Sequence, residues 1–263
     1  GFPIEERVEQ FGRKKWHVEP SKAHPGLSFT FDEAIALYLG RRFLDPLAGT
    51  LFWDAAQRAF QKIRASLGPA ALKYVAAFSN MFHQTMVGAH DYSKKCDIID
   101  ALLRGIEERH TVIMVYQSLQ ATEPVTYDVD PYGLAYHRGA LYLVGRCKQH
   151  SEIRHWKVDR IDDATFSEMQ FNWPPDFDLH AHLRRSFGVF HGAGDVRVRV
   201  QFSSTVARYV QESSWHESQK LSCRKDGSLL AEFRLSNTEE IKRWLMSFGR
   251  HAEVIEPASL REA

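Results

Sequence analysis

The stretch HRGALYLVGRCKQHSEIRHWKVDRI, residues 137–161, has the alternating pattern of two short strands joined by a polar turn. Its charge is uneven, because only Glu152 and Asp159 oppose its basic residues. Since the formal net charge of the whole chain is only +1, the stretch concentrates positive charge locally. Its basic residues and histidines include His137, Arg138, Arg146, Arg154, His155, Lys157 and Arg160.

The same alternation continues on both sides of this stretch. Residues 111–118 (TVIMVYQS) predict one strand, residues 126–147 predict two, and residues 153–171 predict another pair. Five short strands within about 60 residues, joined by tight turns such as the one at Gly139, are typical of a small β-barrel.

The N-terminal part has a different pattern. Residues 1–20 predict two short strands around a polar turn, and residues 28–110 are expected to be mostly helical. Thr30 is a candidate N-cap that forms a capping box with Glu33, and Pro69 suits the first turn of a later helix. A lone hairpin is only marginally stable, so we expect residues 1–20 to be the end of a unit that starts upstream.

The C-terminal part alternates strands and helices. From residue 196 the order is strand VRVRVQF, a helix, strand QKLSCRK, the turn Asp226-Gly227, strand LLAEFRL, a second helix and strand AEVIEP. This βαββαβ order predicts a ferredoxin-like sheet with helices on one face. The chain is therefore expected to be an α+β protein with a helical region, a small barrel and a ferredoxin-like domain.

The composition is that of a soluble globular protein. Hydrophobic residues make up 44% of the 263 and charged residues 25%, which suits about two domains with substantial cores. Cys96, Cys147 and Cys223 are far apart and form no CxxC pair, so we expect neither a disulfide framework nor a zinc site, and a reducing cytoplasm as the location. No apolar run is long enough to span a membrane, so no membrane partner is expected.

A catalytic site is not expected. The sequence has no GxGxxG motif opening a βαβ unit, no P-loop and no GxSxG nucleophile elbow. His180 and His182 would not share a helix face, so we interpret them as a polar loop rather than as metal ligands. Asp162 and Asp163 are better explained as turn residues than as paired catalytic carboxylates. We therefore expect no enzyme activity, no metal and no cofactor.

Strand alternation predicts which basic and aromatic side chains share a surface. Even-numbered side chains of residues 154–160 are expected on one side of a strand and odd-numbered ones on the other. Arginine binds phosphate bidentately and aromatic faces stack on bases, so such a surface would form an anion pocket. The alternative is an ordinary solvated strand face. If the strands are neighbours in one barrel, the surface gathers Tyr116, Ser118, Tyr142, Arg154 and Arg160.

Together these residues resemble a known family. PYGLAYHRGALYLVGRC and IRHWKVDRI resemble the WYL domain, which is named for a Trp-Tyr-Leu run that is Leu141-Tyr142-Leu143 here. The C-terminal segments Trp215-His216, WLMSFG and EPASLRE resemble the WCX extension that follows WYL domains. The frame around the WYL run agrees at Pro131, Gly133, Leu134, Arg138, Gly139, Val144, Gly145, Arg154, Asp159, Arg160 and Ile161.

The resemblance implies a domain order. Residues 1–20 resemble the last hairpin, or wing, of a winged helix-turn-helix, whose recognition helix is then expected upstream. The resemblance further implies an Sm/SH3-like barrel for WYL and a homodimer in which the linker and WCX parts cross to the partner. The expected domains are a helical linker and dimerisation region at 28–94, WYL at 95–175, a linker at 176–194 and WCX at 195–263.

The resemblance also implies a function. Such proteins are bacterial transcription regulators whose WYL domain binds a nucleic-acid effector, with single-stranded DNA or oligonucleotides as the leading candidates. The N-terminal domain binds duplex operator DNA. The basic stretch at 137–161 is then explained as the effector site. The effector residues carried over by position are Tyr116, His137, Tyr142, Arg154 and Arg160, followed by Ser118, Arg138 and Arg146.

Two other function classes remain open. One is a non-regulatory module that holds single-stranded nucleic acid for a partner enzyme, which an upstream helicase or nuclease domain would favour. The other is an enzyme acting on a nucleotide, for which the sequence offers no set of acid, base or metal ligands. An upstream helix-turn-helix would favour the regulator.

Overall fold

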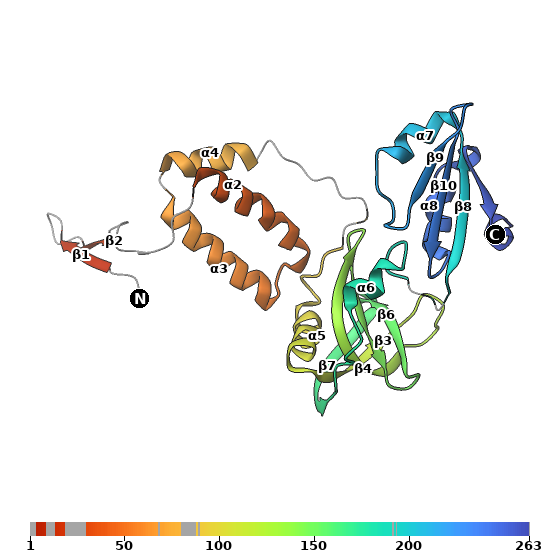
Figure 1. Ribbon diagram of the computed structural model, residues 1–263. Coiled ribbons are helices and arrows are strands. Elements are labelled where there is room, and N and C mark those ends of the chain that lie inside the picture. The colour runs from red at the N-terminus through yellow and green to blue at the C-terminus, as the bar shows by residue number, and fades with distance from the viewer. Residues whose placement is uncertain are drawn as a thin grey trace. The chain divides into compact units, whose positions relative to one another are not determined.

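The structure is a computed structural model that describes residues 4–8, 14–18, 30–67, 69–79, 88, 90–190, 192 and 194–262 (Figure 1). The chain divides into two compact units, residues 1–100 and residues 101–263. The first unit is mainly helical and the second contains two antiparallel sheets, so the mixed helix-and-sheet class is confirmed. In the described residues no helix is both long and apolar enough to cross a lipid bilayer.

The first unit begins with the expected pair of strands. Strand β1 (Ile4–Val8) pairs antiparallel with β2 (Lys14–Val18), and Ile4 lies opposite Val18. The expected turn between them lies outside the described residues. The helical segments that follow are α2 (Phe31–Gly40), the 3-10 segment η2 (Arg41–Leu47), α3 (Leu51–Ser66) and α4 (Pro69–Ser79).

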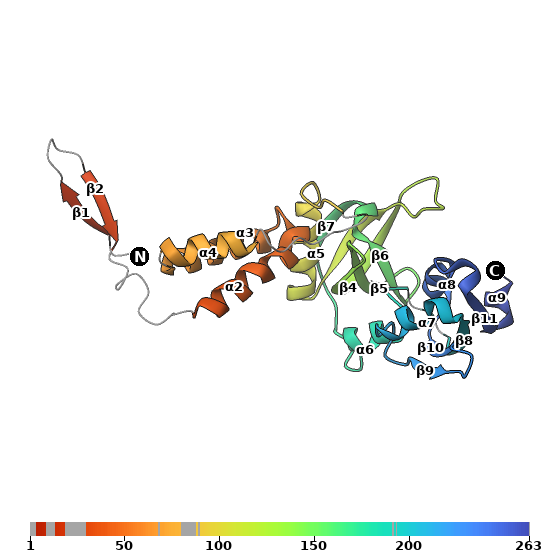
Figure 2. The same ribbon diagram turned by 90° about the horizontal axis from the view of Figure 1, so that it is seen from above.

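Local sequence signals explain where these helices begin. The Glu33 N–H donates to Thr30 Oγ1 at 3.3 Å and the Thr30 N–H donates to the Glu33 carboxylate at 2.7 Å, which confirms the capping box. Thr50 Oγ1 accepts from the Trp53 N–H at 3.2 Å at the start of α3. Pro69 is the first residue of α4, where no N–H is needed. Figures 1 and 2 show α2, α3 and α4 side by side.

Helix α5 (Cys96–Glu108) leads into the first sheet of the second unit. The five expected strands are present, and every neighbouring pair is antiparallel in the order β6-β5-β4-β3-β7. Among residues 101–190 no pairing joins the edge strands β6 and β7, so the sheet is not a closed barrel. The elements are β3 (His110–Tyr116), β4 (Val125–His137), β5 (Ala140–Cys147), β6 (Glu152–Lys157), the 3-10 turn η3 (Val158–Arg160) and β7 (Ile161–Gln170).

The turn between β4 and β5 contains two residues with a left-handed backbone conformation. Arg138 has φ +49° and Gly139 has φ +83°, so both central residues are left-handed, as in a type I′ hairpin turn. Glycine adopts this conformation freely, whereas an arginine Cβ makes it unfavourable. The turn nevertheless matches the twist of the two strands, which pair from His137 opposite Ala140 onwards.

A short helix and a linker cover one face of this sheet. Helix α6 (Leu179–Arg184) begins at Asp178, whose side chain accepts from the Ala181 N–H at 2.8 Å. Its residue Leu179 packs against a small buried cluster that includes Val144 of β5 and Val189 of the linker. The linker is therefore part of the folded unit.

The second sheet follows the expected order of strands and helices. Its strands are antiparallel, in the spatial order β11-β8-β10-β9. The elements are β8 (Val196–Phe202), α7 (Ser204–Gln211), β9 (Lys220–Cys223), β10 (Leu229–Leu235), α8 (Glu239–Met246), η4 (Gly249–His251), β11 (Ala252–Glu256) and α9 (Ala258–Arg261).

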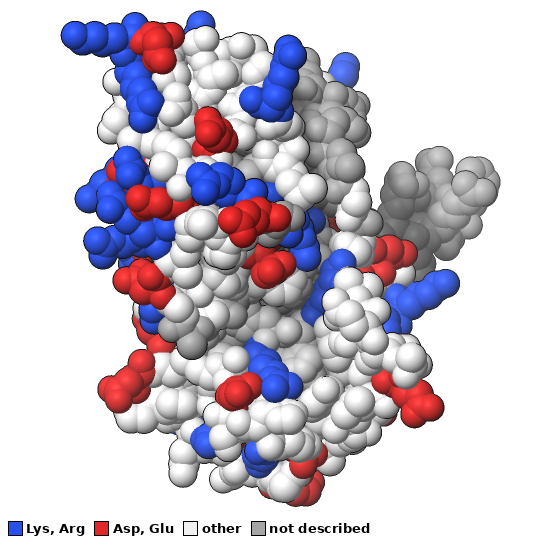
Figure 3. All heavy atoms as spheres, turned by 90° about the vertical axis from the view of Figure 1, so that its right-hand side faces the viewer, with Lys and Arg blue, Asp and Glu red and all other residues white. Residues whose placement is uncertain are grey.

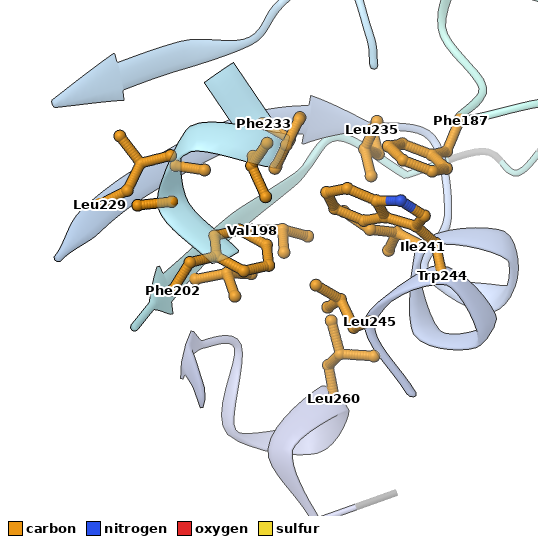
Figure 4. Close-up of a cluster of buried hydrophobic side chains, with 14 residues drawn as sticks. Phe187, Val198, Phe202, Leu229, Phe233, Leu235, Ile241, Trp244, Leu245 and Leu260 are labelled. Carbon is orange, nitrogen blue, oxygen red and sulfur yellow. The ribbon is translucent and has the colours of Figure 1, made fainter. Parts of the chain in front are cut away.

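Strand alternation builds the core between this sheet and its helices (Figure 4). Val198 and Phe202 of β8 and Phe233 of β10 point into it and are almost fully buried. Trp244 of α8 packs over them, and its ring centroid lies 4.6 Å from that of Trp215. Trp215 and Trp244 are therefore packing residues, and the opposite sheet face keeps the charged side chains.

Candidate functional site

Tyr142 is the centre of the candidate site. It lies on β5, half-buried, on the sheet face opposite Leu141 and Leu143. Burial raises the pKa of its hydroxyl, and the nearby Glu240 carboxylate raises it further, whereas Arg160 opposes the change. Asp159 and Tyr116 add smaller upward contributions. These four groups therefore lie within electrostatic range of the Tyr142 hydroxyl.

Arg160 reaches this position through a break in the strand. The expected alternation through residues 154–160 is wrong beyond Lys157, because β6 ends there and η3 follows as a 3-10 turn. The Gln117 N–H donates to the Arg160 carbonyl at 3.1 Å, which ties this turn to the end of β3. In the part of the chain that the structure describes, no carboxylate forms an ion pair with the half-buried Arg160, whereas Asp159 lies 3.9 Å from Lys157 Nζ.

His137 joins the site to helix α8. Its Nε2 lies 3.6 Å from Oε1 of Glu240, which is only 5% exposed. Burial lowers the pKa of His137, the Glu240 carboxylate opposes this, and Arg138 adds to the lowering. Glu240 also accepts hydrogen bonds from the N–H groups of Val189 at 3.1 Å and Phe190 at 2.9 Å. We call the group of Tyr116, His137, Tyr142, Asp159, Arg160 and Glu240 the Tyr142 cluster.

The linker contributes an aromatic residue, Phe190, beside Tyr142. The Phe190 ring meets the Tyr142 ring edge-on, with centroids 6.4 Å apart. The Arg243 guanidinium of α8 lies 5.6 Å above the Phe190 ring. A polar, cationic and aromatic surface is thus assembled from β5, η3, the linker and α8.

Sequence reasoning missed Glu240 and Phe190. The sequence does contain a sign that Glu240 is buried, because Glu240 lies on the same helical face as the apolar residues Ile241, Trp244 and Leu245 of α8. A carboxylate on an apolar stripe needs a buried partner. No pattern in the sequence points to Phe190, because it lies in a glycine-containing linker without helical or strand periodicity.

The other predicted site residues are less closely gathered. Tyr116 is 9% exposed, so little of its ring is accessible to a ligand. Ser118 lies in the loop just after Gln117, next to the η3 turn. Arg138 is exposed at the tip of the β4–β5 turn, beside His137.

Arg154 and Arg146 lie away from Tyr142. Arg154 is opposite Gly145 and shares the face of Trp156, and its guanidinium pairs with Glu152 at 3.1 Å. Arg146 is four residues from Tyr142 on β5, which is about 13 Å along a strand. Whether any predicted residue binds an effector stays a prediction.

Two histidines form a separate pair on the same sheet face. His155 Nε2 of β6 lies 2.9 Å from His182 Nε2 of α6, and His155 Nδ1 hydrogen-bonds the Val189 carbonyl. One ring nitrogen of the pair must stay unprotonated to accept the bond. His180 is exposed and does not join them. Within the described ranges, no group of three or more His, Cys, Asp or Glu side chains is placed to hold a metal ion.

Comparison with known protein families identifies two domains. The WYL domain model matches residues 97–166, and the WCX domain model matches residues 194–263. No curated protein matches the chain.

Two solved structures are similar over most of this chain. The proteasome accessory factor B/C (PafBC) of Arthrobacter aurescens is 21% identical, with a TM-score of 0.33, over 90% of this chain and 34% of that one. This chain therefore spans about a third of the length of PafBC. A CRISPR Cas-related protein is 11% identical, with a TM-score of 0.47, over 92% of this chain and 72% of that one. On these two domain matches, which together include the Tyr142 cluster, the chain contains a WYL domain followed by a C-terminal WCX domain.

Proposed function

We propose that this chain is the sensing part of a bacterial transcription regulator. In this proposal the WYL domain binds a single-stranded nucleic acid, and binding controls a winged helix-turn-helix that contacts duplex operator DNA. The WYL and WCX matches support a regulator of this type, and the β1–β2 hairpin fits the end of such a DNA-binding domain. The chain would act in the cytoplasm as a homodimer, without enzyme activity.

The proposal rests mainly on the environment of the Arg160 guanidinium. A half-buried guanidinium without a carboxylate partner among the described residues is ready to accept an anion from outside the chain. Its planar fork suits a phosphate, and Tyr142 beside it offers a hydroxyl and a ring. A phosphodiester with a stacked base satisfies both groups.

The Tyr142 cluster also suggests how binding is transmitted. Glu240 connects His137 of the WYL sheet to the N–H groups of the linker and belongs to the WCX helix α8. A ligand that contacts Tyr142 or His137 differently in two arrangements of these parts would shift their populations. The strand orders of the two sheets are compatible with the expected Sm/SH3-like and ferredoxin-like assignments, which we keep as part of the proposal.

Fluorescence anisotropy with short labelled single-stranded DNAs tests the proposal. We expect binding that weakens with salt, with a slope of about −0.7 per phosphate neutralised, and weaker binding of a duplex. Arg160→Ala should weaken binding at least tenfold at unchanged stability. Arg154→Ala is the comparison, because Arg154 pairs with Glu152; an equal loss there would extend the site to β6.

The matched control is Arg208→Ala. Arg208 is a highly exposed arginine of α7 that pairs with Glu212 on the helical side of the WCX domain. Equal affinity of the parent, Arg160→Ala and Arg208→Ala proteins would place nucleic-acid binding outside the Tyr142 cluster.

A further inference from the structure

The helix-free face of the WCX sheet has an ordered arrangement of charges. Side chains that alternate with the core residues of β8 and β10 point to this face. In one cross-strand row, Lys220 of β9, Glu232 of β10 and Arg199 of β8 are successive neighbours. In the next row Arg234 of β10 lies directly opposite Arg197 of β8.

Glu232 is fully engaged by two arginines. Its carboxylate lies 2.7 Å from the Arg197 guanidinium and 3.3 Å from Arg199 Nε. The hydrogen bond from Arg197 lowers the pKa of Glu232 most, and the charges of Arg197, Arg199 and Lys220 lower it further. Arg199 also pairs with Glu256 of β11 at 3.2 Å, so two carboxylates lie among the four cations Arg197, Arg199, Lys220 and Arg234.

Lys220 and Arg234 project from the same face without a close carboxylate partner among the described residues, although Lys220 is near enough to Glu232 to lower its pKa. Both are exposed, and neither forms an ion pair with a carboxylate in the ranges that the structure describes. Arg234 is held in place by its backbone, since its N–H donates to Ser218 Oγ at 2.8 Å and its carbonyl accepts from the same hydroxyl at 3.1 Å. Two cations thus project from fixed strand positions.

These side chains surround a cavity. Its volume is about 520 Å³, which is in the range of small-molecule sites. Figure 3 faces the side where β8 lies in Figure 1, and it shows Lys and Arg side chains gathered with a few Asp and Glu side chains among them. The lining residues are Arg197, Ser218, Lys220, Glu232, Phe233 and Arg234.

Stability alone does not explain this arrangement. Like charges directly opposite on neighbouring strands destabilise a sheet, and Arg197 lies opposite Arg234, with its charge offset mainly by Glu232. Opposite charges would suit a merely solvated face better. Local rules are broken in this way where a site needs the residues for binding.

We propose that the helix-free face of the WCX sheet is a second binding site, which takes a phosphate group of a nucleotide or of a nucleic-acid strand. Arg234 and Arg197 supply guanidinium forks for the phosphate oxygens, and Lys220 supplies a point charge. The ligand relieves the repulsion between the two arginines. This site is separate from the Tyr142 cluster and goes beyond the proposed effector function.

The test uses the whole chain carrying Arg160→Ala, so that the two sites are separated. Pyrophosphate is titrated calorimetrically, and a labelled oligothymidylate is titrated by anisotropy. Lys220→Gln and Arg234→Gln should each weaken binding of at least one probe fivefold or more, and the double variant should abolish it. Glu232→Gln should tighten binding, because it frees Arg197. Arg208→Gln, on the helical side, should change neither affinity.

Thermal unfolding separates a binding role from a structural one. Arg234→Gln should leave the Tm unchanged or raise it, because the repulsion from Arg197 disappears; a lower Tm with unchanged affinity would overturn the proposal. So would binding of both probes that the double variant keeps, or no binding of either probe at millimolar concentration. Loss of the oligothymidylate alone identifies a strand as the ligand, and loss of pyrophosphate identifies a free phosphate compound.

The two proposals fail independently. If Arg160→Ala removes oligonucleotide binding and pyrophosphate binding is the same with and without the Lys220/Arg234 double change, the WCX site is refuted and the WYL site stands. If Arg160→Ala leaves oligonucleotide binding unchanged and the double change removes it, the WYL site is refuted and the WCX site stands.

Discussion

The carboxylate of Glu240, on helix α8 of the WCX domain, lies 3.6 Å from Nε2 of His137, at the end of strand β4 in the WYL domain. The same carboxylate caps the N–H groups of Val189 and Phe190 in the linker between the two domains. A single buried acid therefore holds three segments that are far apart in the sequence.

Removing this acid should destabilise the protein. Glu240→Ala leaves the buried N–H of Val189 and the partly buried N–H of Phe190 without acceptors, and we expect a loss of about 2–4 kcal/mol in the free energy of unfolding. Glu240→Gln keeps one oxygen and should cost less. Urea denaturation followed by tryptophan fluorescence measures both. Equal stability of Glu240→Ala and the parent would show that these hydrogen bonds contribute nothing net.

Gly188 is required for the approach of these groups. A methyl group at this position would overlap Glu240 Oε1 and lie 2.7 Å from His137 Nε2. Gly188→Ala should therefore lower the free energy of unfolding by about 1–3 kcal/mol, because the added methyl group displaces Glu240 and His137. Gly40→Ala is the control, since a methyl there meets nothing within 4 Å. A Gly188→Ala protein as stable as the Gly40→Ala protein would contradict the tight contact.

Stability should fall as the pH drops from 7.5 to 5.5. Burial lowers the pKa values of His137 and His216 in the folded chain, so the unfolded chain binds protons more readily in this range. Their contribution is complete above the ordinary histidine pKa of about 6.5 and is lost as the pH falls below it. Denaturation at both pH values measures the effect.

The pH dependence should become shallower when these histidines are replaced. The His137→Gln/His216→Gln double variant removes both groups whose pKa values are lowered, whereas His180→Gln, at an exposed position of α6, serves as the control. If the stability of the double variant depends on pH as strongly as that of the parent, other titrating groups cause the dependence.

The β4–β5 turn offers a stabilising change. Arg138 has a positive φ, and asparagine tolerates this conformation better. Arg138→Asn should raise the free energy of unfolding by up to about 1 kcal/mol. Oligonucleotide affinity measured on the same sample tests the predicted effector role of Arg138. A loss of stability would show that the arginine side chain makes a contact worth more than the strain.

The WCX core should depend on Trp244. Its ring lies within 5.2 Å, centroid to centroid, of Phe187, Trp215 and Phe248, and it is 6% exposed. Trp244→Ala should lower the free energy of unfolding by about 3–5 kcal/mol, and Trp215→Ala, at a half-buried position, should lower it less. The unfolding midpoint in urea measures both. A smaller loss for Trp244 than for Trp215 would reverse the ranking that burial gives.

Features encoded over a few residues were predictable from the sequence. The capping box of Thr30 and Glu33 depends on groups three residues apart, and the alternation of β8 and β10 follows from the strand period. The same reasoning gave the five WYL strands and the order of the WCX elements. It failed at η3, because residues 158–160 contain no glycine or proline to mark the end of the strand.

The sequence by itself determined the elements, their order, the family resemblance and the gathering of basic residues at 137–161. Only the tertiary structure decided which of those residues meet. It placed Arg160 within electrostatic range of Tyr142 and Arg154 on the opposite sheet face, and it brought Glu240 from about a hundred residues away to His137. The reason is physical: periodicity encodes the face of one element, whereas contacts between distant segments depend on how whole elements pack and which buried charges they satisfy.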